Sequence, residues 1–301
     1  PRSATSTDKT QHLNQNMASI TRARPLTSRF FMSTTTTTSP SSNPPKSPAQ
    51  GLFSGAVAVI TGASAGIGEA TARALAARGS TVVLAARNAD PLERVGAQIR
   101  ADGGHALVVP CDMAETADCK RLIATTINAF GGLDILINNA GCHWRGPFEQ
   151  HGTDAFVQMV DVNLRAPIIL TREALPFLIA SGRGAVVNVA SLAGRVPLPG
   201  SVVYSATKFG LRAFSLALAE ELRGRVKVSL VSPGPVSTGF ILDDLKNLTN
   251  LTLSQPMRTA EQIAALVVAC VEDGVPERVE PPLSGLLTTL SYLFPSLARA
   301  I

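Results

Sequence analysis

A tyrosine and a lysine stand four residues apart in the stretch "YSATK", which runs from Tyr204 to Lys208. If the stretch is helical, both side chains project from one face, because residues i and i+4 are neighbours on a helix. An isolated phenol has a pKa of roughly 10, and a nearby ammonium lowers that pKa by about one to three units. The pair could therefore exchange a proton with a substrate. A tyrosine on a helix is otherwise most often a packing residue whose hydroxyl faces water.

Two further polar residues, Ser191 and Asn163, precede this pair and could serve as its partners. Ser191 ends the apolar run "GAVVNVAS", and ligands of doubly wound folds bind at the carboxyl ends of such strands. Its hydroxyl could steady the oxygen of a reacting carbonyl group, although a lone serine there is more often a turn or helix-capping residue. Asn163 lies in "DVNLRAP", inside a helical pattern in which asparagine is a poor helix former.

A glycine-rich turn, "TGASAGIG", follows a continuous apolar run and precedes an alanine-rich helical segment. Its three glycines permit a tight turn and a close approach of the backbone to a ligand. The helix that begins here directs free N–H groups and the positive end of its dipole at the same place. This context predicts a pyrophosphate site. The candidate residues are Gly62, Ser64, Ala65, Gly66, Ile67 and Gly68.

These candidates lie on a regular alternation of apolar strand patterns and helical patterns. The predicted strands are at 56–61, 80–87, 105–112, 133–141, 184–191 and 226–234, and helical segments occupy 69–79, 89–104, 115–132, 151–180 and 202–224. Uninterrupted alternation of this kind predicts an α/β fold with a parallel sheet, right-handed crossovers and helices on both faces. We therefore expect a single-domain, Rossmann-type doubly wound catalytic domain over residues 51–282.

The spacing of the glycine turn resembles the TGxxxGxG pattern of the short-chain dehydrogenase/reductase (SDR) family of the classical type. The resemblance covers about residues 53–275 and includes "NNAG" at 138–141 and "SPG" at 232–234. It implies catalytic roles for Asn163, Ser191, Tyr204 and Lys208, with NAD(P) as cofactor. The further nucleotide contacts that it implies are Asp112, Met113, Asn139, Ala140, Gly141, Tyr204, Lys208, Pro233, Gly234, Val236 and Thr238. The chain departs from the family near its C-terminal end, where "PERVEPPLSGLLTT" leaves the last strand and the usual tetramer contacts in doubt.

The end of the second predicted strand bears on the choice of nicotinamide cofactor. It reads "VVLAARN", with Ala86 where NAD-preferring members of the family carry aspartate, and Arg87 directly after it. No carboxylate is present to bind a ribose 2′-hydroxyl. A guanidinium is suited to bidentate contact with a 2′-phosphate. We expect NADP(H) rather than NAD(H).

The substrate is the least determined part of this interpretation. The candidate pocket residues are His143, Trp144, Arg145, Leu192, Val196 and Leu198, together with a predicted lid at 239–257. They favour an apolar carbonyl compound or secondary alcohol, such as a lipid, steroid or retinoid-like molecule. A 3-oxoacyl thioester reductase is the alternative enzyme, with Arg145 or Arg195 meeting an acyl-carrier phosphate. A nucleotide-binding regulator or scaffold without turnover is the alternative outside catalysis.

The charge distribution argues against a nucleic-acid partner. Residues 1–50 carry six basic side chains and one acidic one, whereas residues 51–301 carry 21 of each. The net charge of +5 therefore belongs to the N-terminal stretch, and the predicted domain has no basic excess. Four cysteines without a CxxC pair or a histidine cluster predict no metal site, and they fit a reducing compartment such as the cytoplasm.

Both ends of the chain have their own composition. Residues 1–50 are rich in Ser, Thr and Pro and predict a disordered tail. The tail resembles an organelle transit peptide, which would place the protein in an organelle matrix, or it is an extension upstream of a start at Met17 or Met32. The apolar segment 283–301 predicts a C-terminal helix that packs on the domain or on a sister subunit of a homodimer or homotetramer. Peripheral contact with a membrane is the alternative.

Overall fold

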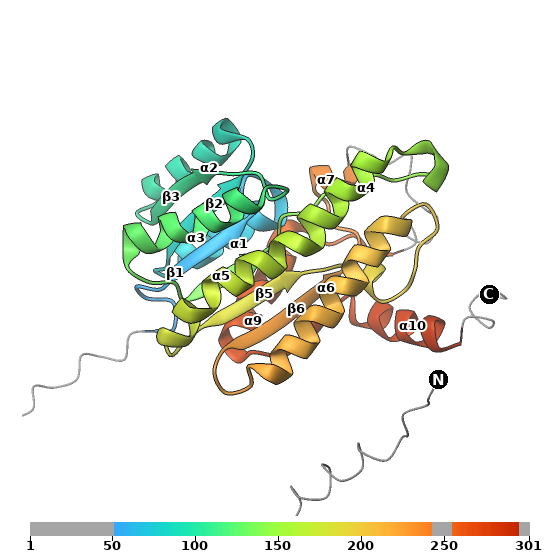
Figure 1. Ribbon diagram of the computed structural model, residues 1–301. Helices are drawn as coiled ribbons and strands as arrows, with labels where there is room; N and C mark the ends of the chain where they lie inside the picture. The colour runs from blue at the N-terminus through green and yellow to red at the C-terminus, as the bar shows by residue number, and fades with distance from the viewer. Residues whose placement is uncertain (1–50, 243–254, 295–301) are drawn as a thin grey trace, which may run out of the picture. The chain divides into compact units, whose positions relative to one another are not determined.

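The computed structural model describes residues 51–242 and 255–294 (Figure 1), so the predictions for 1–50, 243–254 and 295–301 lie outside the described residues. The strands are β1 Val57–Thr61, β2 Thr81–Ala86, β3 His105–Pro110, β4 Ile135–Asn138, β5 Ala185–Val189, β6 Lys227–Pro233 and β7 Glu277–Glu280. The α-helices are α1 Gly66–Ala76, α2 Ala89–Ala101, α3 Thr116–Phe130, α4 Thr153–Val160, α5 Ala166–Ala180, α6 Val202–Glu221, α7 Gly239–Leu242, α9 Ala260–Asp273 and α10 Pro282–Leu293. Short helical turns occur at η1 Phe148–Gln150, η2 Asp161–Arg165 and η3 Leu192–Gly194.

The strands form one parallel sheet in the order β3-β2-β1-β4-β5-β6-β7. The central strands are buried on both faces, which is why the sequence shows continuous apolar runs rather than alternation. Complete burial of a side chain such as Ile60 or Ile137 contributes roughly 1.5–3 kcal/mol. The predicted doubly wound α/β fold is confirmed. Its last strand, which the sequence left in doubt, is β7, where Glu277 pairs with Leu230 of β6.

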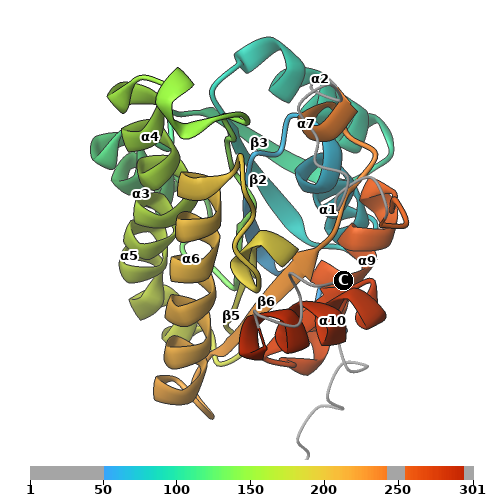
Figure 2. The same ribbon diagram turned by 90° about the vertical axis from the view of Figure 1, so that its right-hand side faces the viewer.

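Helices cover both faces of the sheet (Figure 2). Helices α1, α2 and α9 share one apolar core with the sheet, and α3, α5 and α6 share a second core on the opposite face. The helix ends follow local rules: α3 ends at Gly131 and α9 at Gly274, each with a positive φ angle. Helix α9 begins with a capping box between Thr259 and Gln262.

The order of the strands determines where a ligand can bind. From β1 the chain runs outward through β2 to β3, and it then returns to the other side of β1 as β4. The connections from β1 and β4 therefore leave the sheet in opposite directions and open a crevice at its carboxyl edge. The predicted candidate residues lie in the connections at this edge.

Helix α10 packs on the C-terminal edge of the sheet. Ser284, Gly285 and Thr288 are buried, and the helix contacts β7 and η3. The described part of the C-terminal segment is thus a helix that packs on the domain. Its other face exposes the large apolar side chains Leu283, Leu286, Leu287, Leu290, Tyr292 and Leu293. Contact of this face with a membrane or a sister subunit stays a prediction, and none of the described helices has the length and apolarity that a membrane span requires.

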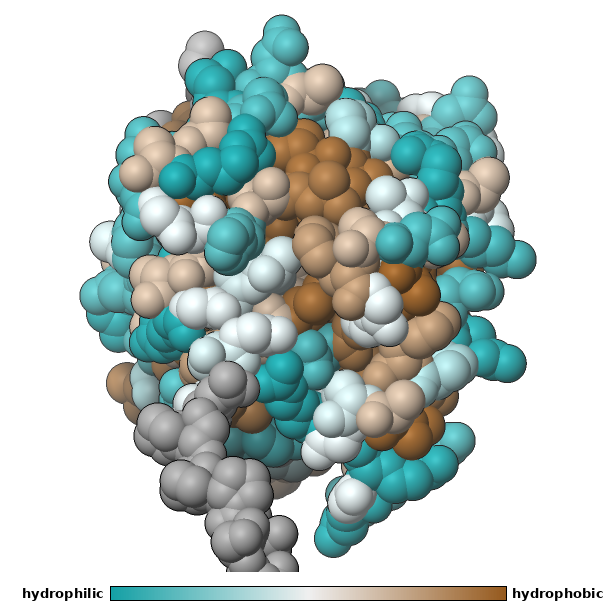
Figure 3. All heavy atoms as spheres, turned by 90° about the vertical axis from the view of Figure 1, so that its left-hand side faces the viewer, coloured by the Kyte–Doolittle hydropathy of each residue, from teal (hydrophilic) through white to brown (hydrophobic). Residues whose placement is uncertain are grey.

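Exposed apolar surface is not restricted to α10. On the face that lies at the left-hand side of Figure 1, hydrophobic side chains gather near the upper centre, and hydrophilic side chains surround them (Figure 3).

Candidate active site

A cavity of about 910 Å³ opens at the carboxyl edge of the sheet. It reaches from the glycine turn to Tyr204 and on to α10, a size typical of ligand sites. Of the predicted residues it is lined by Gly62, Ser64, Ala65, Gly66, Ile67, Arg87, Asp112, Met113, Asn139, Ala140, Gly141, His143, Arg145, Ser191, Leu192, Val196, Leu198, Tyr204, Lys208, Pro233, Gly234, Val236 and Thr238. Gly68, Asn163 and Trp144 are not among its lining residues.

The glycine turn is tight enough that side chains would not fit in it. Gly62 has a φ angle of 65°, and a Cβ atom there would lie 2.9 Å from Ala140 Cα. A Cβ atom on Gly68 would lie 2.2 Å from the carbonyl oxygen of Gly62, so Gly68 acts by letting α1 approach β1. Helix α1 begins at Gly66, and its cap residue Ala65 provides no side-chain acceptor for the first N–H groups. These donors and the space in front of them fit a pyrophosphate.

The "NNAG" segment is tied to the end of β1. The hydroxyl of Thr61 accepts hydrogen bonds from the backbone N–H groups of Asn139 and Ala140, both at 3.0 Å. The side-chain amide of Asn139 donates to the carbonyl oxygens of Thr61 and Gly62, at 3.0 and 3.2 Å. The two connections that border the crevice are thus fixed to each other, and the wall between them is backbone.

Arg87 lies at the end of the cavity remote from Tyr204, directly after β2. It is exposed, and Ala86, Asn88 and Asp112 line the cavity beside it. The carboxylate of Asp112 accepts a hydrogen bond from Ala114 N–H at 2.9 Å, which fixes the turn after β3. At the end of β2, where an adenosine ribose would lie in a doubly wound fold, the protein therefore presents the guanidinium of Arg87 and no acidic side chain.

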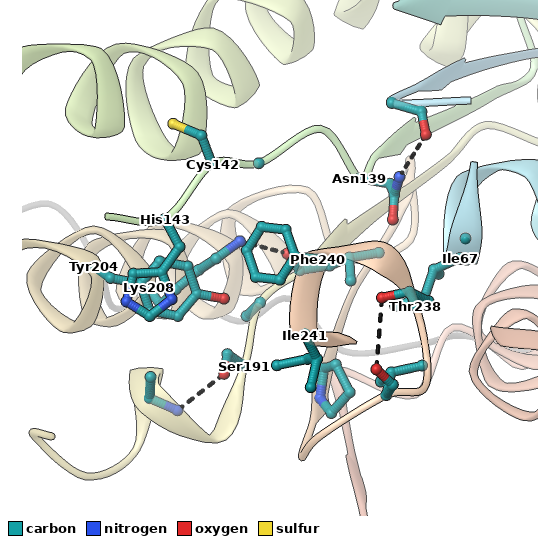
Figure 4. A pocket seen from close by; sticks show the side chains of 18 of the residues that line it. Ile67, Asn139, Cys142, His143, Ser191, Tyr204, Lys208, Thr238, Phe240 and Ile241 are labelled. Carbon is teal, nitrogen blue, oxygen red and sulfur yellow. Dashed lines mark hydrogen bonds between the residues drawn. The ribbon is translucent and has the colours of Figure 1, made fainter. Parts of the chain in front are cut away.

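Tyr204, Lys208 and Ser191 meet at the other end of the cavity (Figure 4). Lys208 Nζ lies 5.6 Å from the centroid of the Tyr204 ring and donates to the carbonyl oxygen of Val189 at 3.0 Å. Burial raises the pKa of Tyr204 to about 12, although a hydrogen bond with Ser191 opposes this change. Burial lowers the pKa of Lys208 to about 8. The direction for the tyrosine differs from the expected one, because burial of the phenol outweighs the lowering effects of the Ser191 hydrogen bond and the Arg145 charge.

Asn163 lies beside the site rather than in it. It is fully buried in η2, where the helix between α4 and α5 widens into a π turn. Its side chain exchanges two hydrogen bonds of 2.9 Å with the backbone of Cys142 and donates to the Thr207 hydroxyl at 3.3 Å. The predicted interruption of the helix by this asparagine is thus present, and its contacts join the segment after "NNAG" to α6.

Aromatic side chains surround the phenol of Tyr204. The His143 ring stacks on it, with 3.9 Å between centroids and 12° between planes, and its Nε2 lies 3.1 Å from Ser201 Oγ. Phe240 of α7 lies 6.2 Å from both rings, and Arg145 donates to the Phe240 carbonyl oxygen at 3.0 Å. His143, Arg145 and Phe240 therefore shape the part of the cavity next to the reactive hydroxyl (Figure 4).

Trp144, which was expected in the pocket, and Arg195, which was considered for an acyl-carrier phosphate, both lie outside the cavity lining. Trp144 points away from the cavity lining, and 44% of its surface is exposed. Arg195 is only 12% exposed in its side chain and pairs with Glu277 at 2.5 Å, which makes it unavailable for an acyl-carrier phosphate.

The sequence-based search missed the contribution of α10. Leu287, Thr288 and Ser291 line the same cavity as Tyr204. A signal for them was present, because small polar residues recur at 284, 288 and 291 within an otherwise apolar helix, which marks one face as different from the rest. Only the packing of α10 against β7 shows that this face meets the cavity.

Comparisons with known proteins agree with this geometry. Residues 56–247 match the family pattern described as short chain dehydrogenase. The 2,5-dichloro-2,5-cyclohexadiene-1,4-diol dehydrogenase LinX of Sphingobium indicum is 36% identical over 77% of this chain and 96% of its own length. The ketoacyl reductase HetN of a Nostoc species is 34% identical over 79% of this chain and 83% of its own length.

Solved structures resemble the chain over a similar range. A metagenomic short-chain oxidoreductase in complex with NADP has a TM-score of 0.66 and 34% identity, over 76% of this chain and 97% of that one. A short-chain dehydrogenase/reductase from Burkholderia phymatum in complex with NAD has a TM-score of 0.73 and 26% identity, over 82% and 96%. The cofactor is accordingly NAD(P), which the glycine turn fits. The chain belongs to the short-chain dehydrogenase/reductase family and is an oxidoreductase of that family.

Proposed function

We propose that the protein reduces a carbonyl group of an apolar substrate with NADPH and, in reverse, oxidises the corresponding secondary alcohol. The observation that supports this most directly is the convergence of Ser191, Tyr204 and Lys208 on the cavity that ends in the glycine turn. Bound at that turn, the nicotinamide cofactor would supply the hydride. The preference for NADPH rests on Arg87 and on the absence of an acid at Ala86.

The protein residues provide the proton and the orientation. The Tyr204 hydroxyl donates a proton to the carbonyl oxygen, and the Ser191 hydroxyl donates a hydrogen bond that holds this oxygen in place. Lys208 keeps a positive charge near the phenol, which favours the loss of its proton. Asn163 is a positioning residue, because it acts through Thr207 and the Cys142 backbone. Catalysis would come mainly from orientation and preorganised hydrogen bonds.

A second candidate activity is supported by one relative. HetN is named a ketoacyl reductase, so a 3-oxoacyl thioester is a candidate substrate. The surroundings of Tyr204 include the apolar or aromatic side chains of Leu192, Val196 and Phe240, with Arg145 beside them. They suit the body of an acyl or cyclic ketone equally, so an assay has to separate the two.

The decisive experiment is Tyr204→Phe, assayed by NADPH oxidation with ketones, aldehydes and 3-oxoacyl thioesters. We expect kcat to fall by roughly 10² to 10⁴-fold, the usual contribution of a general acid, with NADPH affinity retained. Tyr292 is the other tyrosine of the chain and is exposed, so Tyr292→Phe is the matched control and should keep wild-type activity.

Two results would contradict the proposal. Activity retained in Tyr204→Phe would show that another group provides the proton. Tight NADPH binding by the wild type without turnover of any carbonyl compound would favour a regulatory or scaffold role.

A further inference from the structure

Helix α10 contributes to the cavity wall and lies outside the family match, as does the lining residue Gln255. The match ends at residue 247, whereas α10 spans Pro282–Leu293. Its residues Leu287, Thr288 and Ser291 line the cavity that also contains Ser191 and Tyr204. A substrate whose carbonyl group meets Tyr204 could therefore extend towards this helix.

The chemistry of α10 selects against a charged ligand group. No Asp, Glu, Lys or Arg occurs between Pro282 and Leu293. The Thr288 hydroxyl donates within its own helix, to the carbonyl oxygens of Ser284 at 2.8 Å and Gly285 at 3.0 Å. Since its donor is already used, Thr288 offers the cavity mainly its methyl group, and Leu287 beside it is apolar. Ile241 and Leu192 also line this cavity and are apolar.

The helix is seated closely on β7. A Cβ atom on Gly285 would lie 2.8 Å from Val279 Cγ1, so only glycine permits this approach. Ser284, Gly285 and Thr288 are buried in the contact. The position of Leu287 at the cavity is thus set by the packing of the neighbouring turn of the helix.

A buried ion-pair network connects α10 to the catalytic serine. Arg195 directly follows η3, the turn that begins after Ser191, and its Nη1 lies 2.5 Å from Glu277 Oε1. Its Nη2 donates to the Thr289 hydroxyl of α10 at 2.7 Å. Glu277 also accepts two hydrogen bonds of 2.9 Å from Arg212 of α6, the helix that carries Tyr204 and Lys208. One carboxylate therefore joins the serine turn and the tyrosine helix, and Arg195 extends the connection to α10.

We propose that α10 forms a distal subsite for the uncharged, apolar tail of the substrate, with Leu287 as its main contact. We also propose that the Arg195–Thr289 hydrogen bond fixes the distance between this subsite and Ser191. The inference rests on the proposed carbonyl reduction and assigns its substrate class: elongated ketones whose tail runs from Tyr204 towards α10. Leu287 and Thr289 are then specificity-determining and positioning residues, respectively.

The first test measures kcat/KM for NADPH-dependent reduction of 2-alkanones from 2-butanone to 2-dodecanone. In the wild type, each methylene that reaches the subsite should raise kcat/KM by roughly fourfold. Leu287→Ala should lower kcat/KM by about tenfold for the long ketones and leave the short ones unchanged. Leu283→Ala is the matched control, because Leu283 is on the same helix, is more exposed and does not line the cavity. An equal loss for short and long ketones, or no loss, would overturn the subsite.

The second test asks whether the Arg195–Thr289 hydrogen bond sets the position of α10, independently of the apolar surface that the helix offers to the substrate. Thr289→Val removes the acceptor for Arg195 with little change of shape, and Thr289→Ser keeps it. We expect Thr289→Val to raise KM for the long ketones roughly tenfold to hundredfold, the loss of one hydrogen bond to a charged group, while kcat for 2-butanone stays constant. Thr289→Ser should restore the wild-type KM. If valine and serine behave alike, the hydrogen bond does not position the subsite.

A binding measurement distinguishes failure of this inference from failure of the proposed function. Calorimetric titration of the NADPH-loaded protein with 2-alkanols of the same lengths measures binding without turnover, because cofactor and ligand are both in the reduced form. Length-dependent binding that Leu287→Ala weakens, without reduction of any ketone, would overturn the proposed function and retain the subsite. Reduction of ketones with binding that is independent of Leu287 would retain the function and overturn the subsite.

Discussion

The two ends of the cavity differ in what forms their walls: main-chain atoms at one end and side chains at the other. At the glycine turn the wall is largely backbone: a Cβ atom on Gly62 or Gly68 would collide with neighbouring main-chain atoms, and the side chains of Thr61 and Asn139 tie β1 to the segment after β4. At the opposite end the wall is side chains, contributed by His143, Phe240 and Leu287 from segments that are far apart in the sequence. The backbone end can accept one kind of ligand, whereas the side-chain end can be changed one residue at a time.

This contrast explains why the sequence predicts the cofactor end of the cavity more specifically than the substrate end. A backbone cradle needs glycines at fixed spacing within a strand–turn–helix unit, and such a requirement leaves a short motif. A wall of side chains needs only apolar residues of suitable size, which many sequences provide. The cofactor class is therefore readable from the chain, and the substrate is not.

The largest expected effect tests the rigidity of the backbone end. In Gly68→Ala the new Cβ atom would meet the Gly62 carbonyl oxygen, which cannot move without displacing the turn. We expect NADPH affinity to fall by roughly hundredfold or more, measured by fluorescence titration. Gly132→Ala is the control, because nothing lies within 4 Å of a Cβ atom there. Wild-type affinity of Gly68→Ala for NADPH would show that the glycine turn tolerates a side chain, which would contradict the contrast between the two ends of the cavity.

The next effect concerns the charge buried at the side-chain end. The folded protein lowers the pKa of Lys208 to about 8 from an ordinary value of 10.5. Between these values the Lys208 side chain binds more protons in the unfolded chain than in the folded one, so its contribution to the free energy of unfolding should rise with pH. The destabilisation of the folded protein by burial of the charged Lys208 is fully present below pH 8. Lys208→Met should abolish this pH-dependent rise of roughly 3 kcal/mol and stabilise the protein at pH 7.

Urea unfolding of both proteins at pH 7, 8, 9 and 10 measures this contribution as the difference in the free energy of unfolding between wild type and Lys208→Met. The difference is needed because burial also raises the pKa values of Tyr204 and the four cysteines, whose contributions fall with pH in both proteins. Lys120→Met is the matched control, because Lys120 is exposed on α3, and it should keep the wild-type pH dependence. A difference between wild type and Lys208→Met that does not change with pH would contradict the assignment of this titration to Lys208.

The smallest effect sharpens the cofactor assignment. Arg87→Ala should raise the KM for NADPH by roughly tenfold and leave the KM for NADH unchanged, because only NADPH carries the 2′-phosphate. Arg94→Ala removes an exposed charge from the neighbouring helix α2 and should change neither value. A wild-type preference for NADH, or an equal loss for both cofactors, would reverse the assignment to NADP(H).

Much of the fold and the cofactor end could be predicted because their signals are local. The buried strands produce continuous apolar runs, and the glycine turn and "NNAG" follow them directly. Strand β7 gave no such signal. Its sequence "ERVE" is mostly charged, since it lies at the edge of the sheet, where Glu277 meets two arginines. The sequence suggested an acyl-carrier phosphate as a partner for Arg195 for a similar reason. Its actual partner, Glu277, is 82 residues away, so the sequence does not show the pairing.

The sequence by itself determined the doubly wound sheet, the family, the nucleotide cradle and the order of Asn163, Ser191, Tyr204 and Lys208. Each of these depends on residue type and short spacing, which the chain displays directly. Only the tertiary structure decided that α10 lines the cavity, that Trp144 does not, and that burial shifts the pKa values of Tyr204 and Lys208. Burial and long-range pairing are properties of the packed chain, and they depend on which surfaces the other elements cover.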